Sequence, residues 1–119
     1  MAPTIVPAGT RPEFVVGGSG GPLIISAVAQ VIVDVVAYGW DLADAVRAPR
    51  VHDQGVPAVL VVEPGVDPGA RVALERLGHR IVEQPALGAS SAVGLRVDGT
   101  PVAAADARKD GGGEIVGRP

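Results

Sequence analysis

The chain of 119 residues contains no cysteine. This absence excludes disulfides, thiolate metal sites and cysteine nucleophiles, and it leaves the redox compartment open. Aromatic residues are also scarce, with one Trp, one Tyr and one Phe, although 47% of the chain is hydrophobic. The core must therefore be built mainly from Val, Ile, Leu and Ala side chains, and the chain belongs among folded globular proteins.

Positive charge is sparse and scattered. The formal net charge is −3, and the ten basic residues comprise nine Arg and the single Lys109. They form no patch or stripe that could follow a phosphate backbone. Nucleic acid is therefore not an expected partner.

Long apolar runs are missing as well. The most apolar segment, residues 22–38, is interrupted by Ser26, Gln30 and Asp34, and it is shorter than the roughly 20 residues that a bilayer span needs. The first residues show neither the basic nor the apolar region of a secretory signal. We expect no membrane span, and the sequence assigns no compartment.

Periodicity and turn signals predict a layered, mixed α/β fold. From its length we expect a single domain over residues 1–119, with residues 109–119 as a loose Gly-rich tail. Asp98-Gly99 predicts a hairpin between the last two strands, and a first hairpin is expected near the N-terminus. Helices are predicted at residues 22–38, 42–47 and 68–77, and strands at 4–6, 13–16, 50–54, 58–63, 79–83, 92–97 and 101–104.

The first predicted helix needs cover on most of its sides. Its polar residues recur every four positions and form one narrow stripe, while every other face is aliphatic. Gly39 ends this helix, and Asp41 caps the next one. We expect the chain to self-associate when it is made alone.

A glycine cluster carries most of the chemical signal. Gly17-Gly18-Ser19-Gly20-Gly21 lies between a predicted strand and a predicted helix, so its backbone N–H groups can converge on an anion. The cluster has no P-loop lysine and lacks the spaced glycines of dinucleotide sites, which argues against a nucleotide. The oxyanion of an acyl-transfer intermediate is the other candidate, because adjacent N–H donors stabilise it.

A rival interpretation treats the same cluster as a nucleophile elbow. The pattern G-x-S-x-G would make Ser19 the nucleophile of a small serine hydrolase, with Asp67 and His79 following in the order of such enzymes. Four glycines in five residues match this pattern easily. The α/β-hydrolase sheet also needs several strands before the elbow, and these 119 residues do not supply them.

The remaining polar residues indicate no metal or cofactor. His52 and Asp53 are adjacent and His79 stands alone, without the spacing of a metal site. His52 is expected to be structural or partly exposed, and His79 to begin a strand as an edge or surface residue. Asp106, Arg108 and Asp110 are expected to form salt bridges or to cap the last strand.

Six stretches in sequence order together carry a more specific signal. They are Met1-Ala2-Pro3-Thr4-Ile5-Val6; Val15-Val16-Gly17-Gly18-Ser19-Gly20-Gly21; Asp41-Leu42-Ala43-Asp44-Ala45-Val46 with Ala48-Pro49-Arg50-Val51-His52; Glu63-Pro64-Gly65; Leu77-Gly78-His79; and Ala104-Ala105-Asp106-Ala107-Arg108 with Asp110-Gly111. These stretches resemble the C-terminal part of the small subunit of γ-glutamyltransferases, and they span nearly the whole chain.

The resemblance implies a fold and a chemistry. The fold is the αββα sandwich of N-terminal-nucleophile hydrolases, of which this chain would be a part, formed when a precursor cleaves itself into two subunits. The chemistry is attack of an N-terminal Thr on a γ-glutamyl carbonyl, followed by transfer to water, an amino acid or a peptide. Gly20 and Gly21 match the glycine pair whose backbone forms the family's oxyanion hole.

The chain departs from the family pattern in two ways. Gly18-Ser19 stands where the family has Ser-Pro, which is expected to loosen the turn. The family's serine pair and its nucleophilic Thr would both precede Met1, and removal of Met1 exposes only Ala2. We therefore expect a fragment or truncated relative that is inactive alone, or a non-catalytic assembly subunit that pairs with a separately encoded chain.

Overall fold

The computed structural model describes residues 3–116 of the chain. They form two compact units. The second unit is Ala48–Leu87, and the first unit consists of the segments before and after it. The prediction that residues 1–119 act as one domain remains a prediction.

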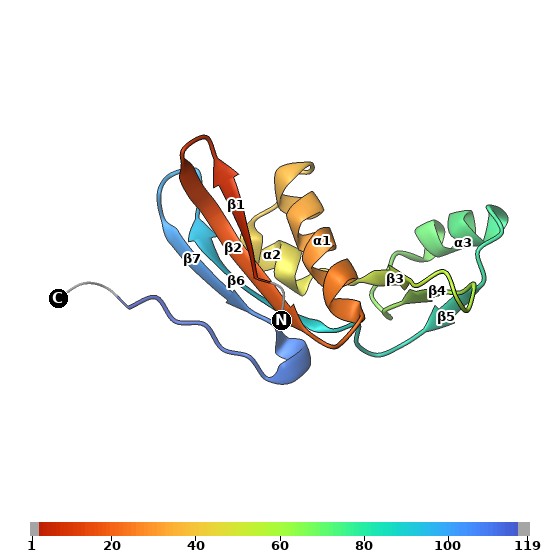
Figure 1. Ribbon diagram of the computed structural model, residues 1–119. Helices are drawn as coiled ribbons and strands as arrows, with labels where there is room; N and C mark the ends of the chain where they lie inside the picture. Colours follow the sequence, from red (N-terminus) through yellow and green to blue (C-terminus); the bar gives the residue numbers. More distant parts are fainter. Residues whose placement is uncertain (1–2, 117–119) are drawn as a thin grey trace. The chain divides into compact units, whose positions relative to one another are not determined.

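The first unit is a four-stranded antiparallel sheet with two helices on one face (Figure 1). The elements are β1 (Thr4–Ala8), β2 (Arg11–Ser19), β6 (Ala89–Leu95), β7 (Pro101–Ala105), α1 (Leu23–Val36), α2 (Leu42–Arg47) and the short 3₁₀ helix η1 (Ala107–Lys109). The strand order is β1-β2-β6-β7, so the two predicted hairpins are joined by the pairing of β2 with β6.

The core of the first unit lies between this sheet and its helices. Along β2 the side chains alternate, and Phe14 and Val16 are almost fully buried. This is the period-two pattern of a strand with one covered face. The buried residues packed around them are Val28, Val31, Leu42, Ala45, Val46, Ala92, Val102 and Ala104.

The opposite face of the sheet is apolar but largely uncovered. Ile5 and Val93 are more than half exposed. The segment after η1 passes this face, because a β-carbon on Gly113 would lie 3.3 Å from Ala103 atoms. Part of the predicted loose tail therefore lies against β7.

The helix α1 ends at Val36, two residues before the end of the helix predicted at 22–38. Pro22 is its N-cap rather than its first residue. The amide of Gly39, at φ +70°, donates to the Val35 carbonyl over 3.1 Å. This left-handed glycine ends the helix as the sequence predicts. The next helix is also confirmed, with the Asp41 carboxylate accepting from the Ala43 amide over 2.9 Å.

The second unit is a small three-stranded sheet with one helix. β3 (Val51–Asp53) pairs antiparallel with β4 (Leu60–Val62), which pairs parallel with β5 (Ile81–Glu83). The helix α3 (Pro68–Arg76) connects the two parallel strands, and the Asp67 carboxylate caps it by accepting from the Ala70 amide over 2.8 Å. Such a crossover helix is the usual connection between parallel neighbours.

The mixed α/β class is confirmed, whereas several strand boundaries were wrong. β2 extends through Ser19 because it pairs with β6 as far as Ala89. The strands β3, β4 and β5 are three residues each, shorter than their apolar runs suggested. Of the helices in the described part of the chain, none has the length and apolar character to cross a bilayer.

Candidate functional site

The glycine loop lies between the end of β2 and the start of α1. Gly20 has φ +132° and Gly21 has φ +60°, conformations that residues with side chains rarely adopt. Two consecutive glycines are therefore required by the backbone path itself. The sequence predicted this strand, loop and helix arrangement correctly (Figure 1).

The backbone of Gly88 packs closely against this loop. A β-carbon on Gly20 would lie 2.8 Å from the Gly88 α-carbon, closer than real β-carbons come to other atoms. Gly88 is itself at φ +71°, and its own β-carbon would lie 3.2 Å from the Ser19 carbonyl oxygen. Gly88 was not predicted, because it lies four residues before the strand predicted at 92–97 and nothing in its neighbours indicates the contact with Gly20.

The loop glycines leave two adjacent donors available. The Gly20 and Gly21 carbonyls accept from the Leu23 and Ile24 amides over 3.3 and 3.2 Å, which closes the first turn of α1. Within residues 3–116, neither glycine amide N–H has a hydrogen-bond partner. Consecutive free N–H groups at the start of a helix are suited to stabilise a negative charge.

The departure at Gly18 lies in the strand rather than in the turn. Gly18 is buried within β2, where a β-carbon would lie 3.0 Å from the Ala89 carbonyl oxygen and 3.5 Å from side-chain carbons of Ile24 and Val28. Gly18 therefore lies outside the turn that Gly18-Ser19 is expected to loosen, and the looser turn stays a prediction. The missing side chain of Gly18 instead lets α1 pack close to the sheet.

A buried acidic residue holds the strand beside the loop. Asp106, only 3% exposed, accepts from the Ser90 amide over 2.8 Å, and Ser90 pairs with Gly18 across the sheet. The same carboxylate pairs with Arg108 over 3.0 Å, and Arg108 also donates to the Val46 carbonyl over 3.3 Å. The predicted cluster is confirmed for Asp106 and Arg108, while Asp110 ends η1 at φ 51°.

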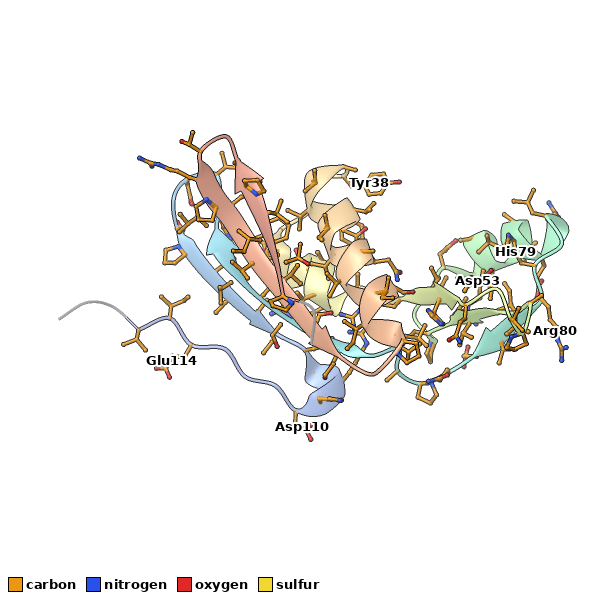
Figure 2. All side chains as sticks on the ribbon, in the orientation of Figure 1. Tyr38, Asp53, His79, Arg80, Asp110 and Glu114 are labelled. Atoms are coloured by element: carbon orange, nitrogen blue, oxygen red, sulfur yellow. The ribbon has the colours of Figure 1, made fainter. Side chains whose placement is uncertain are left out.

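The residues of the serine-hydrolase alternative have other local roles. Ser19 is the last residue of β2 and pairs with Ala89, so it precedes the turn instead of occupying it. Asp67 caps α3, and His79 is exposed in the second unit (Figure 2). An elbow nucleophile must sit on the turn itself, so this geometry argues against Ser19.

In the second unit, two of the quoted motifs come together at Glu63. Its buried carboxylate accepts from the amides of Arg50 over 2.9 Å and Leu87 over 2.7 Å. A β-carbon on Gly65 would lie 3.2 Å from Pro49, so the two stretches also pack against each other.

The candidate metal ligands lie in the second unit. His52, which is 8% exposed, is buried on β3. Among residues 3–116 no group of three His, Cys, Asp or Glu could hold a metal ion.

Similar proteins cover almost the whole chain. The family profile described as gamma-glutamyltranspeptidase matches residues 1–116. The glutathione hydrolase proenzyme of Escherichia coli K12 is 36% identical over 108 residues, which are 91% of this chain but 19% of that protein. The acylase ACY 1 proenzyme of Pseudomonas sp. V22 is 34% identical over 112 residues, covering 93% of this chain and 20% of that protein. The chain therefore spans about a fifth of the length of these relatives.

Solved structures agree with this match. Gamma-glutamyltranspeptidase from Helicobacter pylori superposes with a TM-score of 0.85 at 35% identity, covering 92% of this chain and 61% of that one. The enzyme from Pseudomonas nitroreducens gives 0.86 at 26% identity, covering 98% and 62%. The predicted fold class, part of an N-terminal-nucleophile hydrolase, is thereby confirmed. The chain belongs to the gamma-glutamyltranspeptidase family and corresponds to the C-terminal region of its members.

Proposed function

We propose that this chain supplies the oxyanion-stabilising loop of an enzyme that transfers γ-glutamyl groups. The substrates would be glutathione or related γ-glutamyl compounds, and the acceptors would be water, amino acids or peptides. The observation that carries the proposal is the pair of unpartnered N–H groups on Gly20 and Gly21 at the start of α1. Removing one such donor commonly costs about 100- to 1000-fold in kcat.

The nucleophile of this reaction would come from polypeptide outside the 119 residues. The Thr residues of the chain are Thr4, Thr10 and Thr100. None of them stands at the position that the family resemblance gives to the nucleophile, which precedes Met1. We therefore infer that the Thr whose freed amine serves as the base belongs to that other polypeptide.

The test is the activity of the isolated chain. We expect no turnover of a γ-glutamyl anilide above a heat-killed control, since an oxyanion hole without a nucleophile retains only a small part of the acceleration. We also expect no reaction of Ser19 with a serine-directed fluorophosphonate. Stoichiometric labelling that disappears in both Ser19→Ala and His79→Ala would favour the serine-hydrolase alternative.

A role in assembly is supported by a second observation. The outward side of α1 exposes Ile25 at 75%, Val33 at 46% and Val36 at 60%. Together with the exposed Ala29 between Ile25 and Val33, these residues recur every three or four positions and form a continuous apolar stripe. We propose that the stripe is covered by another polypeptide in the working protein, and that it makes the isolated chain self-associate.

A further inference from the structure

A hollow of about 500 Å³, open to the surface, lies at the far end of α1 from the glycine loop. All of its lining residues belong to the first unit. The glycine loop directly precedes α1 (Figure 1). The hollow is lined by Val35 near the end of α1 and by residues 39–42 that follow it. A helix of 14 residues separates the loop from the hollow by about 20 Å. The hollow is therefore not part of the proposed acyl-transfer site.

Most of the lining is apolar, and one wall is aromatic. Trp40 remains 48% exposed in the turn between α1 and α2, and Leu95 is 53% exposed at the end of β6. The remaining apolar lining residues include Phe14, Val35, Leu42 and Val102. A concave apolar site of this volume is typical of pockets that hold small molecules.

Local hydrogen bonds fix the walls of the hollow. Arg96 pairs with Asp41 over 2.6 Å, which ties the β6–β7 connection to the start of α2. The Trp40 amide donates to the Asp34 carbonyl over 3.0 Å, which holds the Trp40 backbone at the end of α1. These bonds hold the backbone on either side of the hollow in place.

The charged groups around the hollow leave an excess of negative charge. Glu13, Asp41 and Asp98 are carboxylates in the lining, against the single guanidinium of Arg96. Hydrogen bonds from Arg96 and from Thr100 lower the pKa of Asp41 and Asp98 respectively, so both are ionised near neutral pH. Because Arg96 pairs with Asp41 and has only a minor effect on Asp98, the charges of Glu13 and Asp98 remain largely uncompensated within the lining.

We propose that this hollow binds a small organic cation with an aromatic or branched apolar body. The apolar body would be buried against the aliphatic walls, and the cation would lie near the Trp40 ring and the uncompensated carboxylates. A cation over an indole face is attracted by the ring as well as by nearby negative charge. The same arrangement disfavours an anion of equal size.

The single Trp of the chain provides a direct readout. Trp40 emission of the full chain is titrated with three probes of matched size: 2-phenylethylammonium, neutral 2-phenylethanol and anionic phenylacetate. We expect saturable binding of the cation about tenfold tighter than that of the anion, since each of the two exposed carboxylates changes the cation-to-anion affinity ratio by about threefold. The neutral probe should fall between them, and the cation's advantage should decrease with added salt.

Two double variants test whether the preference for the cation comes from the carboxylates of the lining or from the net charge of the whole chain. Glu13→Gln with Asp98→Asn should reduce the preference for the cation to below about threefold. Glu75→Gln with Glu114→Gln removes the same charge from exposed positions outside the lining and should leave the preference unchanged. Circular dichroism checks that every variant keeps its secondary structure.

Three results would overturn the proposal. The first is an equal response to all three probes, and the second is the absence of saturation. The third is an undiminished cation preference in the Glu13→Gln, Asp98→Asn variant. Any of these would show that the hollow is not a cation-selective site.

Discussion

The α-carbon of Gly88 occupies the space into which a side chain on Gly20 would extend, 2.8 Å from the ideal β-carbon position. The contact joins the loop before α1 to the residue before β6, two segments that are far apart in the sequence. It holds the loop against the backbone of the sheet. The position of the two free N–H groups therefore depends on a glycine that the family motif alone does not include.

The first prediction follows from this contact. Gly20→Ala should lower the free energy of unfolding by about 2 kcal/mol or more, because the new β-carbon meets backbone at a strained φ of +132°. Gly21→Ala is the matched control, since its φ is +60° and no atom lies within 4 Å of its β-carbon position. That change should cost about 1 kcal/mol, from backbone strain alone. Urea unfolding of the full chain measures both, and equal losses would contradict the close contact.

The second prediction concerns Glu63, which accepts from two buried amides. Glu63→Gln replaces one acceptor oxygen with an NH₂ group that faces a donor, so we expect a loss of about 1–3 kcal/mol. Glu83→Gln tests an exposed carboxylate of the same unit, paired with Arg71 over 2.7 Å. Its loss should stay below about 1 kcal/mol. Chemical denaturation compares the two, and a larger effect of the Glu83 change would refute the bridging role.

Local signals in the sequence predicted the elements of the fold well. Gly39 and Asp41 marked the change from α1 to α2, and Asp98-Gly99 marked the hairpin, because caps and turns depend on neighbouring residues. The glycine cluster of the candidate site was found for the same reason, whereas the family resemblance singled out Gly20 and Gly21 within it. Each of these features depends on residues that are adjacent in the sequence.

Long-range partners could not be predicted in this way. Gly88 is important because it meets Gly20, and Glu63 because it meets the Arg50 and Leu87 amides. Neither pairing follows from periodicity or composition. The extension of β2 to Ser19 was missed for a similar cause, since pairing with β6 outweighs the low strand propensity of glycine.

The third prediction concerns how stability depends on pH. Replacing Asp41 and replacing Asp34 should change the stability at neutral pH in opposite directions. The hydrogen bond from Arg96, aided by the Ala43 amide, lowers the pKa of Asp41 from its ordinary 3.8. Its stabilising contribution is therefore complete above that value and is lost as the pH falls through the lower folded-state pKa. Asp41→Asn should be less stable at pH 7, by less than about 1 kcal/mol because the pair is exposed. The difference should shrink below pH 3.8.

Asp34 serves as the control of opposite sign. Burial raises its pKa above 3.8, so its ionised form opposes folding once the pH exceeds the ordinary value. Asp34→Asn should therefore be more stable than the parent at pH 7, and this gain should disappear in acid. Thermal unfolding across a pH series measures both variants. The same sign of change for both at neutral pH would contradict the assignment.

The fourth prediction tests the apolar stripe on α1. Ile25→Glu with Val33→Lys should reduce self-association of the isolated chain, because both side chains are exposed on the outward side of the helix. Val72→Lys, at a residue 46% exposed on α3, is the control and should leave association unchanged. Sedimentation over a concentration series gives the readout. A parent chain that stays monomeric at every concentration would contradict the prediction.

The most direct test of the central claim is the activity of a chimera. In the Escherichia coli glutathione hydrolase proenzyme, the C-terminal region that matches this chain is replaced by residues 1–119, and turnover of a γ-glutamyl anilide is measured after processing. We predict turnover by the processed chimera, none by the isolated 119 residues, and a fall of about 100-fold in kcat when Gly20→Ala displaces the N–H donors. A processed, soluble chimera without turnover, or an isolated chain with it, would contradict the claim that this chain supplies the oxyanion loop but not the nucleophile.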